Sequence, residues 1–186
     1  MSTVMARCFV SVDIKDEGVL DRIASVQGRL AIDGVKPVER ENLHFTLKFL
    51  GELDNDQIGL IDRKLASITS VPKFKIRMVG VGAFPNMEHI NIIWVGGESA
   101  ELIELAHMIR KLTEGAGDER AFTPHLTIAR VKWVRDKEEL VRIVQEIKGI
   151  ELGTVSVSEF NLKHSTLGQD HPTYTILKSY MLRGPT

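Results

Sequence analysis

Short stretches of period-two alternation and stretches of helical periodicity follow one another along the whole chain, and this order constrains the fold more than any other feature. Residues 7–12 alternate aliphatic with mixed side chains and predict a strand, whereas aliphatic residues at three- and four-residue spacing predict a helix over 16–30. Further helices are expected after Asp54, Ser99 and Asp136, each of which can cap a helix. Further strands are expected at 42–50, 74–78, 89–95, 122–131, 154–163 and 174–182.

The two halves of the chain share one order of elements: a helix, a strand that contains His-x-Thr, a second helix and further strands. Because turn residues rather than helices separate several strands, we expect an α+β fold and not a purely parallel sheet. The repeated order predicts two pseudo-symmetric lobes of antiparallel sheet, with helices outside and a central cleft that carries one motif from each half. No linker-like segment interrupts the sequence, so we expect a single domain over 1–186.

Composition excludes several classes of protein. The 186 residues are 43% hydrophobic and 26% charged, which is typical of a folded globular domain. No apolar stretch approaches the roughly 20 residues of a membrane span, and Asp13 comes too early for a secretory leader, so we expect a cytoplasmic protein. Cys8 is the only cysteine, which excludes an internal disulfide and a thiolate zinc site. A formal net charge of -1 argues against indiscriminate binding of nucleic acid through a large basic field.

Two His-x-Thr segments carry the chemistry that the sequence offers. Residues two apart in a strand share a face, so His44 lies beside Thr46, and His125 beside Thr127. Four of the six histidines have Thr two residues on, so the bare spacing is a weak signal. Only the segments at 44 and 125 also have apolar residues at the second and fourth positions inside a convincing strand, and these two are therefore singled out.

Two explanations of these histidines stay open at this point. A single strand histidine is usually half-buried and hydrogen-bonded to backbone. Two imidazoles that face one cleft suit an in-line displacement at phosphorus, because one takes a proton from the attacking oxygen while the other protonates the leaving oxygen. One such segment in each half favours the second explanation. Lys48 continues the face of His44 by its spacing, but we expect it to be solvated, and Gly96-Gly97 is interpreted as a turn rather than a phosphate loop.

The segments 42–51 (NLHFTLKFLG) and 124–131 (PHLTIARV) resemble the two HxTx signatures of the two-histidine (2H) phosphoesterases. They are most similar to the LigT-like branch, the RNA 2',3'-cyclic phosphodiesterases also called 2'-5' RNA ligases. The resemblance covers nearly the whole chain, including residues 7–13, 82–85, 93–94 and 165–167. One departure is visible, because many relatives carry an aromatic residue shortly before the first motif, where this chain has Lys36-Pro37-Val38.

The resemblance implies a role for each site residue. It makes His44 the proton donor to the leaving ribose oxygen and His125 the base that activates water. It places Thr46 and Thr127 on phosphoryl oxygens, with Arg130 as the cation beside them. The remaining substrate-binding candidates are Arg7, Phe9, Ser165 and Tyr174, of which Phe9 fits the core equally well. No metal site and no cofactor are expected, because the histidines lack metal-ligand spacing.

The implied function is metal-independent hydrolysis of RNA 2',3'-cyclic phosphate ends to 2'-phosphates, with reverse 2'-5' RNA ligation. The implied partners are RNA ends or oligonucleotides with a 2',3'-cyclic phosphate, tRNA fragments among them, and mononucleotides. We expect a monomer that does not associate with membranes. Two alternatives stay open: a non-catalytic nucleotide- or RNA-binding module on the same fold, and a metal-dependent phosphohydrolase, although the latter lacks the usual carboxylate ligands. The residues alone also permit the mirror assignment of the two histidines.

Overall fold

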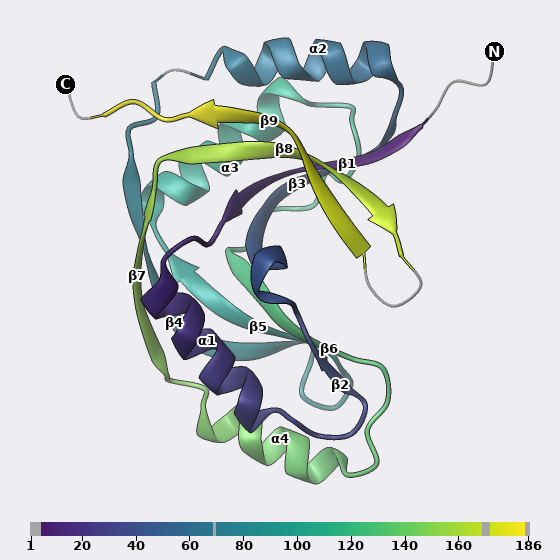
Figure 1. Cartoon of the computed structure of the whole chain (residues 1–186), viewed down its shortest axis with the longest axis vertical. Coiled ribbons are helices and arrows are strands. Elements are labelled where there is room, and N and C mark those ends of the chain that lie inside the picture. Colours follow the sequence, from purple (N-terminus) through teal and green to yellow (C-terminus); the bar gives the residue numbers. More distant parts are fainter. Residues whose placement is uncertain (1–4, 69, 169–171, 185–186) are drawn as a thin grey trace.

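The structure is a computed structural model that describes residues 5–68, 70–168 and 172–184. Its strands form one nine-stranded antiparallel sheet within this part of the chain (Figure 1). The strands are β1 (Ala6–Asp13), β2 (Val35–Pro37), β3 (His44–Leu53), β4 (Phe74–Pro85), β5 (Ile90–Glu98), β6 (His125–Val131), β7 (Glu151–Val157), β8 (Glu159–Leu167) and β9 (Pro172–Met181).

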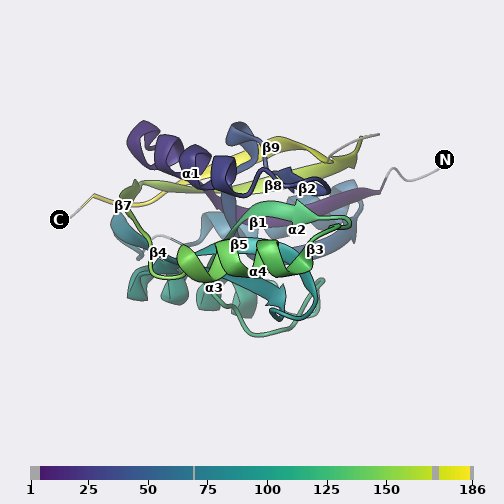
Figure 2. The same cartoon turned by 90° about the horizontal axis from the view of Figure 1, so that it is seen from below.

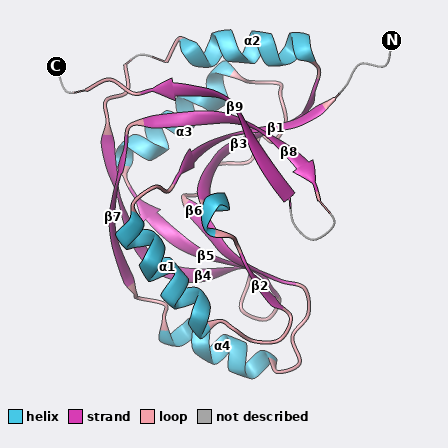
Figure 3. Ribbon diagram, viewed as in Figure 1, coloured by secondary structure: helices cyan, strands magenta, loops and turns pink. Residues whose placement is uncertain are grey.

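The strand order confirms the predicted pseudo-symmetric halves. Neighbouring strands follow the order β7-β4-β5-β6-β3-β1-β8-β9, and β2 pairs with the end of β6. The two strands that begin with the predicted histidines, β3 and β6, therefore lie at the centre, with three further strands of the path on either side of them (Figure 3). The α+β class is confirmed, and both His-x-Thr segments lie where the two halves join.

Four α-helices begin at the side chains that the sequence marks as caps. They are α1 (Glu17–Arg29), α2 (Asn55–Ala66), α3 (Ala100–Leu112) and α4 (Lys137–Glu146), and a short 3-10 helix, η1 (Arg40–Asn42), precedes β3. Asp54 and Gln57 form the predicted capping box at α2. The caps of the other three helices each accept a backbone N–H three residues on. These bonds occupy donors that have no partner inside the helix, which explains where each helix starts.

The helices cover the sheet with their apolar faces. In α1 the buried residues are Val19, Leu20, Ile23 and Val26, and in α3 they are Leu102, Leu105, Ala106 and Ile109. α1 packs on β6 and β7, whereas α3 packs on β3 and β4. Figure 2 shows α1 and α3 on opposite sides of the strands. Within the described ranges, no helix combines the length and the apolar character that a bilayer crossing requires.

The structure differs from the sequence interpretation in three elements. The single strand expected at 154–163 is two strands, because the chain turns at Ser158 between β7 and β8. The short strand β2 was not predicted, since three residues carry no measurable periodicity. The interpretation of Gly96-Gly97 as a turn is wrong, because both residues lie inside β5. A Cβ atom at Gly97 would lie 2.6 Å from the Phe45 ring, so glycine here permits close packing.

Candidate active site

The centre of the sheet brings the two predicted motifs together. Phe45 of β3 lies opposite Leu126 of β6, and both side chains are fully buried. The antiparallel register around this pair places His44 across from Thr127, and Thr46 across from His125. The two histidines therefore lie on a diagonal, with about 7 to 8 Å between their backbone positions. We call the face of the sheet that carries these four polar side chains the site face.

Each histidine is oriented by the backbone carbonyl two residues before it. His44 Nδ1 lies 2.7 Å from Asn42 O, and His125 Nδ1 lies 2.7 Å from Thr123 O. A carbonyl oxygen only accepts, so Nδ1 carries the proton in both rings. In the neutral ring Nε2 is then the lone-pair atom, and in His44 it lies 3.1 Å from Thr46 Oγ1, which donates to it. Nε2 is therefore the ring nitrogen available for proton transfer in both histidines.

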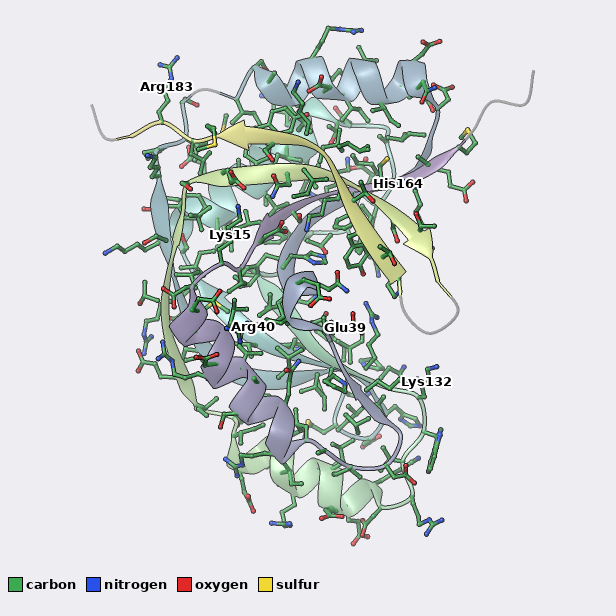
Figure 4. The ribbon with its side chains drawn as sticks, viewed as in Figure 1. Lys15, Glu39, Arg40, Lys132, His164 and Arg183 are labelled. Atoms are coloured by element: carbon green, nitrogen blue, oxygen red, sulfur yellow. The ribbon has the colours of Figure 1, made fainter. Side chains whose placement is uncertain are left out.

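The segment before β3 is anchored to a helix. Arg40, at the start of η1, pairs with Glu17 and Asp21 of α1, and its nitrogen lies 2.9 Å from the Asp21 carboxylate (Figure 4). Because η1 ends at Asn42, this contact holds the carbonyl that orients His44.

An aromatic side chain packs against each histidine. The Phe9 and Tyr174 rings lie 5.1 and 5.2 Å from the His44 ring and 5.1 Å from each other. In the other half, Phe84 lies 5.0 Å from the His125 ring at 90°. Phe9 is only 2% exposed, so it is a core residue that also contacts the candidate site. Phe84 was not singled out in the sequence, although it stands in the segment 82–85 that carries part of the family resemblance.

An extra residue in β3 changes the position of Lys48. The register with β1 pairs Thr46 with Ser11 and Lys48 with Val10, so Leu47 forms a β-bulge. The bulge turns Lys48 to the face of Val10, where the lysine is 2% exposed. Its Nζ donates to Thr113 O at 2.9 Å and to Glu119 at 3.0 Å. The expectation of a solvated Lys48 on the face of His44 is therefore wrong.

A matching bulge in β6 brings Arg130 to the site face. Trp94 of β5 lies opposite Thr127, whereas Ile92 lies opposite Arg130, because Ile128 is the extra residue. Without the bulge, the spacing of three between Thr127 and Arg130 would place them on opposite faces. The exposed Arg130 also lies opposite Lys36 of β2, and its charge reaches His44.

The other two substrate-binding candidates lie farther along the same row of strands. Arg7 of β1 lies opposite Ser165 of β8, and Ser165 lies opposite Tyr174 of β9. Within the described ranges, the ring contacts and hydrogen bonds of His44 include neither Arg7 nor Ser165. Tyr174 is thus the member of this row that touches a histidine.

A cluster of buried polar residues beside His44 was not predicted. We call Ser11, Asp13, Asn161 and Lys163 the Asp13 cluster. Lys163 Nζ and Ser11 Oγ donate to Asp13 Oδ1 at 2.7 and 3.0 Å, and Asn161 Nδ2 donates to Oδ2 at 3.1 Å. Asp13 lies opposite His44 in the β1–β3 register. No sequence spacing joins these residues, because β8 reaches β1 only in the folded sheet.

The surroundings of His44 oppose its protonation. Burial is the main cause that lowers the pKa of His44 to about 4, and the charge of Lys163 acts in the same direction. The Asn42 carbonyl and the Asp13 carboxylate act in the opposite direction. At pH 7 His44 is therefore neutral in the ligand-free protein.

Other histidines and a separate cavity lie away from the paired motifs. His164 lies opposite the buried Cys8, so it stands on the face opposite the site face, and His171 lies outside the described residues (Figure 4). A cavity of about 320 Å³ lies between the β4–β5 turn and α4, and includes no predicted site residue. Among the described residues, no three His, Cys, Asp or Glu side chains gather closely enough to hold a metal ion.

A sheet with two pseudo-symmetric halves and one HxTx strand from each half at its centre defines a two-histidine phosphoesterase. The sequence matches the family described as LigT like Phosphoesterase over residues 12–94 and 95–174, and the chain belongs to this family.

Three similar proteins illustrate the relationship. A Methanocaldococcus jannaschii protein named RNA 2',3'-cyclic phosphodiesterase is 35% identical over 94% of this chain and 99% of its own length. A crystal structure from Thermus thermophilus superimposes with a TM-score of 0.83 at 26% identity, over 97% of this chain and 100% of that one. E. coli LigT complexed with 3'-AMP has a TM-score of 0.78 at 25% identity, over 96% and 99% of the two chains.

Proposed function

We propose that the chain is an enzyme that hydrolyses 2',3'-cyclic phosphates at RNA ends, leaves 2'-phosphates, and can run the reverse 2'-5' joining reaction. The observation that carries this proposal is the diagonal of His44 and His125 across the Phe45–Leu126 pair. Displacement at phosphorus needs one proton donor and one acceptor on opposite sides of the reacting group, and two Nε2 atoms on one face supply both. The family relatives named for this activity support it.

In the proposed reaction His125 Nε2 takes a proton from water, whose oxygen forms the new bond to phosphorus. His44 Nε2 gives a proton to the ribose 3'-oxygen as its bond to phosphorus breaks, so the phosphate stays on the 2'-oxygen. Thr46, Thr127 and Arg130 donate to the non-bridging oxygens, where negative charge develops in the transition state. The family resemblance supports this assignment of the two histidines.

The low pKa of His44 adds a condition to this assignment. His44 is neutral at pH 7 in the ligand-free protein, so a general acid at this position must gain its proton when the substrate binds. The cyclic phosphate carries a negative charge, and a nearby opposite charge favours the protonated imidazole. With the roles exchanged, the neutral His44 would act as the base and the product would be a 3'-phosphate.

The test is to incubate the pure protein with an oligonucleotide that ends in a 2',3'-cyclic phosphate, with and without chelator, and to separate the products against 2'- and 3'-phosphate standards. We expect 2'-phosphate with and without chelator. A 3'-phosphate product would exchange the two histidine roles. Activity lost with chelator and restored by zinc or manganese would support a metal-dependent phosphohydrolase. Tight binding without turnover would support the binding-module alternative.

The proposed partners are RNA ends or oligonucleotides with a 2',3'-cyclic phosphate, with tRNA fragments and mononucleotides as further substrates. The complex of E. coli LigT with 3'-AMP supports nucleotide binding by the family. We propose a single domain that works as a monomer, since one sheet runs through both halves and one chain supplies both histidines. We further propose that it acts in the cytoplasm.

A further inference from the structure

The Asp13 cluster is a buried charged group that the proposed reaction leaves without a role. The Lys163 and Asp13 side chains are only 4% and 12% exposed. Asn161 donates to Asp13, although its own Oδ1 is buried without a hydrogen-bond partner among the described residues. Buried polar groups are normally paired, so the hydrogen bond to the carboxylate orients this amide even though its oxygen accepts no hydrogen bond there. The cluster therefore holds a carboxylate and an ammonium group in fixed places beside His44.

The two halves of the sheet differ at the positions of this cluster. Asp13 lies opposite His44, whereas Gly96 lies opposite His125. The same register places Ser11 opposite Thr46 in the first half, but an aromatic residue, Trp94, opposite Thr127 in the second half. The backbone hydrogen bonds of the two histidines are alike, so the two rings differ in their burial and in the charges around them.

Charged or titratable groups face His44 from four strands. Asp13 comes from β1, Lys163 from β8, Arg130 from β6 and Tyr174 from β9. The two cations oppose protonation of the imidazole, and the carboxylate favours it. Lys163 has a larger effect on His44 than Asp13 has, so the pair acts on balance as a cation toward the ring.

We propose that the Asp13–Lys163 pair adds to burial in keeping His44 neutral before substrate binds, so that His44 takes up a proton from solution when an anionic phosphate binds. Lys163 cannot turn away from the ring because it is held 2.7 Å from Asp13 in a buried cluster. A bound phosphate adds negative charge beside the ring, which favours the protonated imidazole. The proton uptake in this proposal rests on the proposed function, whereas the effect of the pair on His44 concerns the protein without substrate.

The effect of the pair on His44 is tested by following the His44 imidazole by NMR as a function of pH. Asp13→Asn and Lys163→Gln both keep hydrogen-bonding groups in the cluster and change its charge in opposite directions. We expect the His44 titration to move to lower pH in Asp13→Asn and to higher pH in Lys163→Gln, by about one pH unit each. Shifts in the same direction, or no shift, would overturn the proposal.

Two controls separate this effect from a loss of structure. Lys163→Arg keeps the cation and should keep the wild-type titration of His44, which also provides a folded variant if Lys163→Gln does not fold. His125 is followed in the same spectra as a reference, because its half of the sheet lacks the pair. A titration that changes in Lys163→Arg as much as in Lys163→Gln would assign the effect to packing and count against the proposal.

The proton uptake is tested by calorimetry with adenosine 2',3'-cyclic phosphate and the His125→Ala variant, in which hydrolysis is blocked. Binding is measured at pH 7 in two buffers with different heats of ionisation. We expect uptake of roughly one proton per nucleotide bound. A variant that also carries Asp13→Asn should take up less, because His44 loses the carboxylate that favours its protonation. Binding without proton uptake would overturn the proposed protonation of His44 by substrate. Absence of binding, together with the expected His44 shifts, would count against the proposed function and leave the role of the pair standing.

Discussion

Phe45 lies directly opposite Leu126, and this pair of fully buried residues sets the register in which the two HxTx strands meet. A shift of one residue would exchange the buried and the site faces of both strands. By setting this register from the buried face, the pair determines the positions of the two His and two Thr side chains on the site face. Gly97 of β5 allows this arrangement, since the Phe45 ring occupies the space of its missing Cβ.

Gly97→Ala should destabilise the protein by about 1 to 3 kcal/mol, because the added methyl group displaces a buried ring. The measurement is urea unfolding followed by circular dichroism. Gly28→Ala is the matched control, since nothing lies within 4 Å of the added Cβ in α1. That variant should be neutral or slightly more stable, as alanine favours helix over glycine. Equal stability of both variants would show that Phe45 can move without cost.

His44→Ala and His125→Ala should each lower the rate of cyclic phosphate hydrolysis by at least about 100-fold, because each removes one of two coupled proton transfers. The double variant should lose little more than either single variant, since the pair acts as one unit. His89→Ala, at an exposed position, should keep the wild-type rate. Substantial turnover by either single variant would remove the basis of the two-histidine mechanism.

Arg130→Gln and Lys48→Met should separate two cations that look alike in the sequence. Loss of Arg130 should lower activity by about 10- to 100-fold through a missing charged hydrogen bond, with little change in stability. Loss of Lys48 removes its hydrogen bonds to the Thr113 carbonyl and to Glu119 and should cost about 1 to 3 kcal/mol of stability, with activity retained below the unfolding temperature. Steady-state kinetics and thermal unfolding measure the two effects, and the opposite pattern would contradict the assigned faces.

The free energy of unfolding should fall as the pH is lowered from about 6.5 to about 4. In this window the unfolded chain binds a proton at His44 that the folded protein, with a pKa of about 4, does not bind. The loss attributable to His44 is at most about 3 kcal/mol and is complete below pH 4. His44→Gln should flatten this part of the curve, whereas His107→Gln, at an exposed position on α3, should not. An unchanged slope in His44→Gln would show that burial does not suppress its protonation.

Local features of the sequence were sufficient to predict the helices and the two motif strands. The caps at Asp54 and Ser99 and the aliphatic spacing behind them act over one or two helical turns, so they are visible without the fold. The alternation of 44–47 and 125–128 likewise places each His and Thr on one face before any pairing is known. The repetition of the motif in the two halves predicted a central cleft that carries one motif from each half.

Tertiary structure decided which other residues join the site. The bulges at Leu47 and Ile128 reverse the alternation after each motif, so Lys48 turns into the core and Arg130 turns to the site face. A bulge depends on the register with the neighbouring strand, which the local pattern does not contain. The Asp13–Lys163 pair joins residues that are 150 positions apart, and it exists because β1 and β8 become neighbours in the folded sheet. Periodicity predicts the face of a side chain in a regular strand. Pairing between distant strands determines where bulges change that face and which charges surround the side chain.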